Sequence, residues 1–143
     1  MITSGNPSFQ SFNINGVEHI SPKNAYSELQ NGTAIMVDVR EDDEYMVEFI
    51  SLNDVLHYPM SSIMDNLKNI PVDKPIITIC QRGVRSTKVA NMLNRNGFVN
   101  SVNLDGGFIK WKAEGLPFES ILPKACNSCL FSGLESGSCS CSQ

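Results

Sequence analysis

The chain has 143 residues, a formal net charge of −4 and 41% hydrophobic residues, which suits one globular domain with a buried core. Its acidity argues against a nucleic-acid partner, and no apolar run approaches the roughly 20 residues that a membrane-spanning helix needs. Residues 1–15 are uncharged and lack the basic start and apolar middle of a secretory signal. We therefore expect a cytoplasmic protein with reduced thiols and no membrane partner.

The first third of the chain predicts two strands around a helix. Residues 1–16 suit a loose or weakly paired lead-in, and residues 17–20 a short edge strand. Ser21-Pro22 is typical of a helix start, because the serine can cap the helix and the proline fits its first turn. Asn31-Gly32 ends that helix, and the apolar run 34–39 is typical of a strand covered on both faces.

The middle of the chain continues the alternation. The acidic segment 41–48 predicts one or two helical turns, and the charge run 41–44 predicts a solvated face. Residues 55–58 suit a third strand, and a short helix can follow from Ser61 or Ser62. A buried strand over 75–79 then leads into a helix from Arg85 to Asn96.

The last predicted elements complete an alternating order. Residues 99–104 suggest a strand, Asp105-Gly106-Gly107 a tight turn, and residues 108–114 a short helix whose Phe108 and Trp111 cover the sheet. Alternating strands and helices predict an α/β fold with a parallel central sheet and helices on both faces. Ligands of such sheets bind beyond the carboxyl ends of the strands.

Cys80 stands where the predicted strand 75–79 meets the following helix. The free N–H groups of a helix start carry partial positive charge, and Arg82 and Arg85 add more. A thiolate is stabilised in such a place, and the same N–H groups can hold a small anion. Cys80 is therefore the candidate nucleophile, and an inert buried thiol is the plainer alternative.

Charge is distributed unevenly along the chain. Residues 41–54 contain six acidic residues and no basic one. Residues 74–104 contain no acidic residue and five basic ones, which are Lys74, Arg82, Arg85, Lys88 and Arg95. A local positive field inside an acidic protein favours a small anionic ligand over a polyanion.

Three segments carry a resemblance to a known family. They are Val37-Asp38-Val39-Arg40-Glu41, Cys80-Gln81-Arg82-Gly83-Val84-Arg85-Ser86, and Leu104-Asp105-Gly106-Gly107-Phe108 followed by Trp111 and Gly115-Leu116-Pro117. Together they resemble a single-domain rhodanese-like sulfurtransferase. The resemblance extends over residues 15–120, with residues 121–143 as a Cys-rich C-terminal extension.

The resemblance implies a persulfide cycle on Cys80 that needs no cofactor. The thiolate takes the outer sulfur of an anionic donor such as thiosulfate and passes it to cyanide, a thiol or a protein acceptor. The loop that would hold donor and persulfide comprises Gln81, Arg82, Gly83, Val84, Arg85 and Ser86. In it Arg85 would satisfy carbonyl groups or clamp the anion, and Arg82 would steer donors. Asp38 and Arg40 would brace the loop from the end of the sheet.

Two other functions stay open at this stage. Four residues separate Cys80 from Arg85, whereas phosphatases of the similar fold have five, so the loop is tight for a tetrahedral phosphate. A non-catalytic rhodanese-like module, which binds proteins or carries sulfur, is the alternative of a different class. His19 and His57 have no partner at motif spacing, and we expect them at the surface or a sheet edge.

The C-terminal extension holds four of the five cysteines, Cys126, Cys129, Cys139 and Cys141. Four thiolates in two close pairs could hold a structural zinc ion, and iron–sulfur ligation would use the same residues. They could also relay sulfur from the Cys80 persulfide, or be ordinary thiols of a flexible tail.

Overall fold

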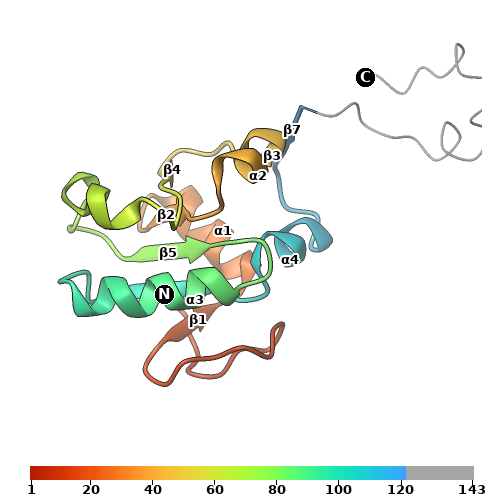
Figure 1. Cartoon of the computed structure of the whole chain (residues 1–143). Helices are drawn as coiled ribbons and strands as arrows, with labels where there is room; N and C mark the ends of the chain where they lie inside the picture. The colour runs from red at the N-terminus through yellow and green to blue at the C-terminus, as the bar shows by residue number, and fades with distance from the viewer. Residues whose placement is uncertain (122–143) are drawn as a thin grey trace, which may run out of the picture.

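The computed structural model describes residues 1–121 and forms one α/β unit (Figure 1). Its main sheet has five parallel strands in the order β1-β6-β5-β2-β4. The strands are β1 Glu18–Ile20, β2 Ile35–Asp38, β4 Val55–His57, β5 Ile76–Ile79 and β6 Ser101–Leu104. The predicted fold class and its parallel sheet are confirmed.

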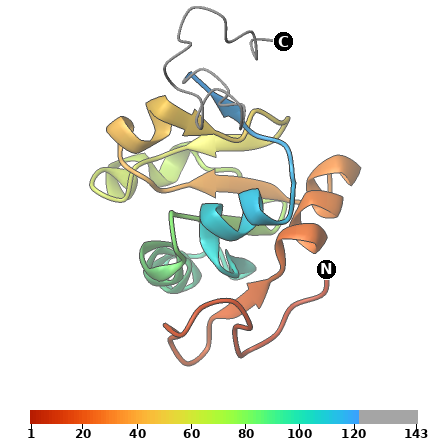
Figure 2. The same cartoon turned by 90° about the vertical axis from the view of Figure 1, so that its right-hand side faces the viewer.

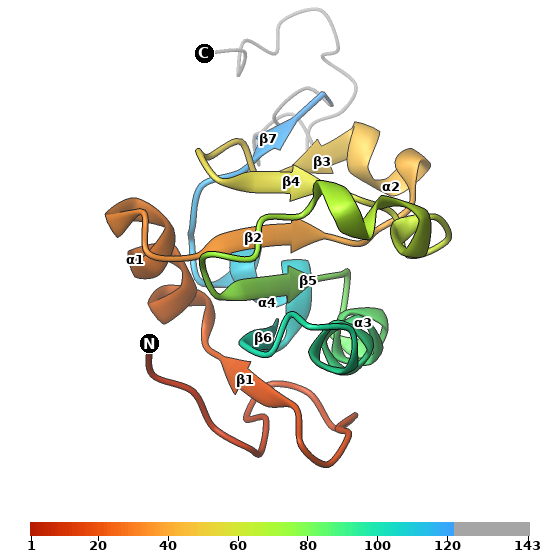
Figure 3. The ribbon, with the colours of Figure 1, turned by 90° about the vertical axis from the view of Figure 1, so that its left-hand side faces the viewer.

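Helices cover both faces of this sheet, as predicted (Figure 3). Helices α1 (Pro22–Asn31) and α4 (Gly107–Ala113) lie on one face. Helix α3 (Val84–Arg95) and the 3₁₀ helix η1 (Ile63–Asn69) lie on the other. Within residues 1–121, no helix is both long and apolar enough to cross a bilayer.

Two apolar cores form because successive residues of a strand point to opposite faces. In β5, Ile77 and Ile79 join the core under α1 and α4, while Ile76 joins the core under α3 and η1. Phe108 and Trp111 are fully buried in the first core, as predicted. Each such buried side chain contributes about 1.5–3 kcal/mol of hydrophobic stabilisation, so the two cores fix the sheet that carries the site.

Local sequence signals set the ends of α1. The Ser21 hydroxyl accepts a hydrogen bond from the Asn24 N–H at 3.2 Å, and Gly32 ends the helix in the left-handed conformation with φ 70°. Only glycine adopts that conformation without steric cost, so the predicted start and end are both confirmed.

A second, small sheet lies beyond β4. The short helix α2 (Asp42–Val47) leads into β3 (Glu48–Phe49), which pairs antiparallel with β7 (Glu119–Ser120). Figure 2 places this pair at one end of the molecule and the N-terminal segment at the other. The pairing joins residues from distant parts of the chain, and no local pattern predicts it.

The N-terminal segment is held against the sheet more firmly than the sequence predicts. Ser4 and His19 exchange two backbone hydrogen bonds of 2.9 and 2.8 Å. The carboxylate of Asp105 accepts hydrogen bonds from the Ser8 and Phe9 N–H groups at 2.6 and 3.0 Å. The segment is therefore weakly paired with β1, one of the two predicted states, and the carboxylate of Asp105 beyond β6 holds its backbone in addition.

Candidate functional site

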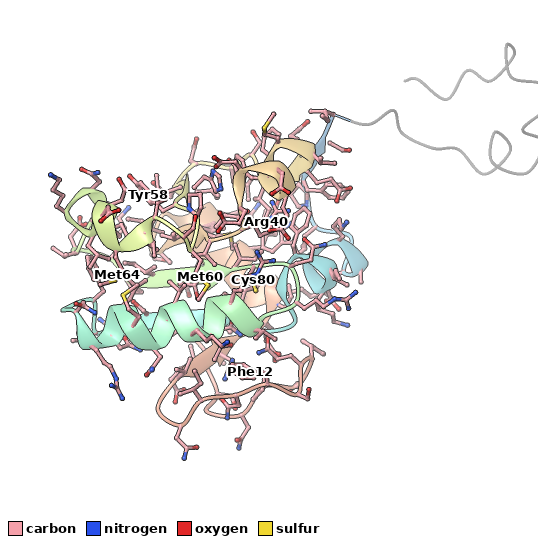
Figure 4. The ribbon with its side chains drawn as sticks, in the orientation of Figure 1. Phe12, Arg40, Tyr58, Met60, Met64 and Cys80 are labelled. Atoms are coloured by element: carbon pink, nitrogen blue, oxygen red, sulfur yellow. The ribbon has the colours of Figure 1, made fainter. Side chains whose placement is uncertain are left out.

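Cys80 follows the last residue of β5, at the carboxyl edge of the sheet (Figure 4). Its side chain is only 1% exposed. Asp38 of β2 pairs with Ile79, and Thr78 pairs with Asn103 of β6, so three strands end together at this edge. The buried central strand thus delivers the cysteine to the place where α/β sheets bind ligands.

Two polar groups of the loop face the sulfur of Cys80. The Gly83 N–H donates to Sγ at 3.0 Å, and the Ser86 hydroxyl oxygen lies 3.3 Å from Sγ. Gly83 has φ 99°, a left-handed conformation that residues with a Cβ atom disfavour. This conformation turns the loop back toward the cysteine. The hydrogen bond from Gly83 favours the ionised thiolate, which is the nucleophilic form of cysteine.

The turn before α4 closes the loop from behind. The Phe108 N–H donates to the Cys80 carbonyl at 2.8 Å, and the Ile109 N–H donates to the Gln81 carbonyl at 3.1 Å. A Cβ atom on Gly107 would lie 2.6 Å from the Gln81 carbonyl oxygen. Glycine at position 107 therefore allows the turn 105–107 and the start of α4 to approach the Cys80 loop closely enough to form these hydrogen bonds.

Arg85 does not clamp the loop carbonyls; its guanidinium forms a two-pronged ion pair with Glu44 of α2. The Nη1–Oε1 and Nη2–Oε2 distances are 2.7 and 2.8 Å. The Arg85 hydrogen bond lowers the pKa of Glu44, and the Glu44 hydrogen bond raises the pKa of Arg85. The expectation that the acidic run is only a solvated face is wrong for Glu44, because α2 turns it toward the loop.

Asp38 and Arg40 form a buried pair at the end of β2. The Arg40 Nη2 lies 2.9 Å from the Asp38 Oδ2 and 2.6 Å from the Glu48 carbonyl oxygen. The guanidinium carbon of Arg40 lies 4.4 Å from the ring centroid of Phe108, at cation–π distance. The pair therefore reaches the loop indirectly, through the residue whose N–H binds the Cys80 carbonyl.

A buried polar chain leads away from Cys80 and was missed from the sequence. The Ser86 hydroxyl donates to the Asn103 Oδ1 at 2.5 Å, and the Asn103 Nδ2 lies 3.0 Å from the His19 Nδ1. His19 lies on the edge strand β1, one of the two predicted positions, but it is buried there, with 3% of the residue exposed. Burial lowers the pKa of His19, against the opposing effect of Asp105 and Glu18. Asn103 carries no motif; only the adjacency of β5 and β6 brings it to Ser86.

A comparison with protein families shows to which family the chain belongs. The family model described as the rhodanese-like domain matches residues 21–114. The chain belongs to the rhodanese-like family.

Several relatives of this rhodanese-like chain carry sulfurtransferase names. It is 32% identical over 101 residues to the thiosulfate sulfurtransferase GlpE of Actinobacillus pleuropneumoniae serotype 3 (strain JL03), which covers 71% of this chain and 92% of the relative. It is 34% identical over 82 residues to the putative sulfurtransferase YtwF of Bacillus subtilis (strain 168), covering 57% of this chain and 77% of the relative.

Solved structures agree with the family. A rhodanese-like domain protein of Staphylococcus aureus matches with TM-score 0.61 and 33% identity, over 71% of this chain and 98% of that one. The polysulfide-sulfur transferase homodimer of Wolinella succinogenes matches with TM-score 0.62 and 28% identity, over 71% of this chain and 77% of that one.

The outer residues of the rhodanese-like loop border a cavity of about 360 Å³. Arg82 and Val84 are exposed and line it together with Phe9 and Phe12 of the N-terminal segment and Lys110 of α4. Arg82 is thus on the outside of the loop, whereas Gly83 and Ser86 face the sulfur. The remaining predicted loop residue, Gln81, contributes its carbonyl to α4.

The predicted metal site cannot be placed in this fold. Cys126, Cys129, Cys139 and Cys141 lie outside the described residues. Within residues 1–121, no group of three or more His, Cys, Asp or Glu side chains is arranged to hold a metal ion. His57 is half-buried on the edge strand β4, where its ring stacks on Tyr45 and its Nε2 lies 2.8 Å from the Arg40 carbonyl oxygen.

Proposed function

We propose that this protein is a sulfurtransferase that moves a sulfane sulfur from an anionic donor to a thiophilic acceptor through a persulfide on Cys80. The observation that supports it most directly is the Cys80 Sγ at 3.0 Å from the Gly83 N–H and 3.3 Å from the Ser86 hydroxyl. The names of the relatives point to thiosulfate as the donor class.

In the first step the Cys80 thiolate attacks the outer sulfur of thiosulfate. A new S–S bond forms on Cys80, the S–S bond of the donor breaks, and sulfite leaves with the electron pair of that bond. The lone pair of the attacking sulfur becomes the new bond, and the outer sulfur keeps the negative charge that it carried in thiosulfate, so the product on Cys80 is a persulfide anion. Backbone N–H groups of residues 81–86 are the proposed donors to both anions, with that of Gly83 already directed at the sulfur.

In the second step an acceptor nucleophile attacks the outer sulfur of the persulfide. With cyanide the new C–S bond gives thiocyanate, and the Cys80 thiolate leaves with the electrons of the S–S bond, ready for another cycle. A low-molecular-weight thiol or a protein thiolate would act in the same way. No cofactor takes part in either step of this proposal.

The loop residues have distinct proposed roles. Gly83 stabilises the ionised sulfur and Ser86 lies beside it. Arg85, neutralised in part by Glu44, connects the first turn of α3 to α2. Arg82 is exposed and steers anionic donors toward the loop. Within residues 1–121 its guanidinium forms no ion pair with a carboxylate. Asp38 and Arg40 support the loop through Phe108.

The domain assignment is part of the same proposal. Residues 15–120 form the sulfurtransferase domain, and residues 121–143 are an extension whose cysteines bind zinc or accept sulfur. The alternative function is a rhodanese-like module that binds proteins or carries sulfur without turnover. A phosphatase is less favoured, because the loop has one residue fewer than those enzymes use.

Sulfur transfer from thiosulfate to cyanide, followed as thiocyanate, tests the proposal. Wild-type protein should turn over, and Cys80→Ala should lose the activity. Mass spectrometry of wild-type protein after thiosulfate treatment should show an added mass of about 32 Da, one sulfur atom, on the peptide that holds Cys80. Equal activity in the two proteins would overturn the role of Cys80. A persulfide without turnover would favour the sulfur-carrier alternative.

A further inference from the structure

Gln10 makes an unusually complete set of hydrogen bonds for a residue of an N-terminal segment. Its Oε1 accepts from the Gly106 N–H at 2.9 Å and from the Asn103 Nδ2 at 3.0 Å. Its Nε2 donates to the carbonyl oxygens of Phe12 and Gly83 at 2.9 and 3.2 Å, with the Thr87 hydroxyl also at 3.2 Å. Gln10 lies outside residues 21–114, which match the family model.

The orientation of the Gln10 amide follows from its backbone partners. A backbone N–H can only donate, so Gly106 requires the Gln10 oxygen on its side. A backbone carbonyl can only accept, so Gly83 and Phe12 require the Gln10 nitrogen on the opposite side. The positions of Oε1 and Nε2 are therefore assigned by backbone groups that can act only as donor or only as acceptor.

Gln10 in turn fixes the orientation of Asn103. Because Oε1 faces Asn103, the asparagine must present its Nδ2, which leaves its Oδ1 directed at the Ser86 hydroxyl. The opposite orientation would place an NH₂ group against Ser86 and an oxygen against an oxygen at Gln10. The Ser86 proton is thus directed to Asn103, and the Ser86 oxygen, 3.3 Å from the Cys80 sulfur, is placed by a residue of the N-terminal segment.

Gln10 also holds Gly83, whose backbone N–H is the donor to the sulfur. Gly83, whose N–H donates to Sγ, accepts from Gln10 through its carbonyl oxygen. A Cβ atom at position 83 would lie 1.8 Å from the Gln10 Oε1, so the glutamine packs directly on the glycine. Glycine at φ 99° has wide conformational freedom, and Gln10 helps to restrict it, together with the Thr87 N–H and hydroxyl that donate to the same carbonyl oxygen.

We propose that Gln10 is a positioning residue for the Cys80 loop: one side-chain amide, supplied from outside residues 21–114, holds the Gly83 N–H toward the reactive sulfur and, through Asn103, places the Ser86 hydroxyl beside it. The N-terminal segment is then part of the site and does more than cover the sheet edge. As far as turnover is concerned, this inference rests on the proposed sulfurtransferase function. The effect on the thiolate itself does not.

The test compares the full-length wild-type chain with Gln10→Met and Gln10→Glu. Methionine has similar volume and no amide, so it removes every side-chain hydrogen bond of Gln10. Glutamate keeps an acceptor for Gly106 and Asn103 but turns an oxygen toward the Gly83 carbonyl. Thr3→Ala is the matched control, because it removes the 2.9 Å bond to Glu18 from the same N-terminal stretch without contact to the loop.

The decisive measurement is the rate of iodoacetamide alkylation of Cys80 against pH, followed by mass spectrometry of the peptide that holds it. Gln10→Met should move the midpoint of this profile to higher pH and lower the alkylation rate at pH 7 on the order of threefold, since a misdirected donor stabilises the thiolate less. Gln10→Glu should show a smaller shift in the same direction. Thr3→Ala should match wild type.

Turnover and thermal unfolding distinguish a role of Gln10 in positioning the Cys80 loop from a role in only anchoring the N-terminal segment. For thiosulfate and cyanide we expect kcat to fall in Gln10→Met, and the alkylation midpoint to move with it. A lowered melting temperature with the wild-type midpoint and kcat would overturn the proposal and leave Gln10 as an anchor. If Gln10→Met does not fold, the midpoint of Gln10→Glu decides. A wild-type chain without sulfurtransferase activity would contradict the proposed function, while the alkylation profile would still test Gln10.

Discussion

Arg85 and Glu44 join the Cys80 loop to α2 through two parallel hydrogen bonds of 2.7 and 2.8 Å. Both side chains are about one-third exposed, at 31%. Glu44 also accepts from the Glu41 N–H at 3.0 Å, which completes the cap of α2. The carboxylate therefore ties together a helix start and the first turn of the helix that follows the loop.

We predict that Glu44→Gln makes the stability of the protein less dependent on pH. The folded-state pKa of Glu44 is lowered, so the pair stabilises the fold above the ordinary value of 4.5, and this contribution is lost as pH falls through the folded pKa. At pH 7 the variant should be less stable by about 0.5–1 kcal/mol, as for an ion pair open to solvent.

Urea unfolding of wild type and Glu44→Gln between pH 3 and 7 measures this, with the two curves converging at the acidic end. Asp73→Asn, at an exposed acidic side chain, is the control and should track wild type. A constant difference between wild type and Glu44→Gln over the whole range would contradict the assignment.

A second pH effect is expected from His19. Burial lowers its pKa below 6.5, so the unfolded chain binds the proton more readily than the fold. The contribution of neutral His19 to the free energy of unfolding is complete above pH 6.5 and is lost as pH falls through the folded-state pKa of His19. His19→Gln keeps an amide for Asn103 and should flatten the curve below pH 6.5 after normalisation at pH 8. The same slope in both proteins would show that other groups titrate there.

Gly107→Ala should be more destabilising than Gly97→Ala. Both glycines have positive φ, 70° and 95°, so both substitutions incur backbone strain of about 1 kcal/mol. At position 97 no atom lies within 4 Å of the added methyl group, whereas at position 107 it would meet the Gln81 carbonyl oxygen at 2.6 Å. Chemical denaturation should separate the two by about 1–3 kcal/mol, as for overpacking, and only Gly107→Ala should reduce sulfur transfer. Equal losses of unfolding free energy in the two variants would show that the Cys80 loop can move away from the added methyl group without an energetic penalty.

The zinc hypothesis for the C-terminal extension is tested by metal analysis of protein purified without chelators. Stoichiometric zinc is expected in wild type, and its loss when Cys126, Cys129, Cys139 and Cys141 are all replaced by serine. Wild-type protein without zinc would remove this hypothesis. In that case, transfer of ³⁵S from Cys80 to these cysteines would test the relay alternative.

Much of the fold was predictable because its signals are local. The apolar run before Cys80, the Ser21 cap and the Gly32 stop each depend on residues within one or two turns. Strand and helix alternation then leaves few arrangements, so the parallel sheet and the position of Cys80 at its carboxyl edge followed. The predicted nucleophile and the residues of its loop are contiguous in the chain, which is why the loop could be outlined without a structure.

The sequence by itself therefore determined the fold class, the family and the candidate nucleophile. Only the tertiary structure decided which side chains surround that loop. Glu44 meets Arg85 across 41 residues, Gln10 meets Gly83 across 73, and His19 meets Asn103 across 84. These contacts depend on β6 lying between β1 and β5 and on α2 bringing Glu44 within hydrogen-bond distance of Arg85. Strand order in a parallel sheet is a non-local property, set by which buried faces pack together, and no spacing along the chain encodes it.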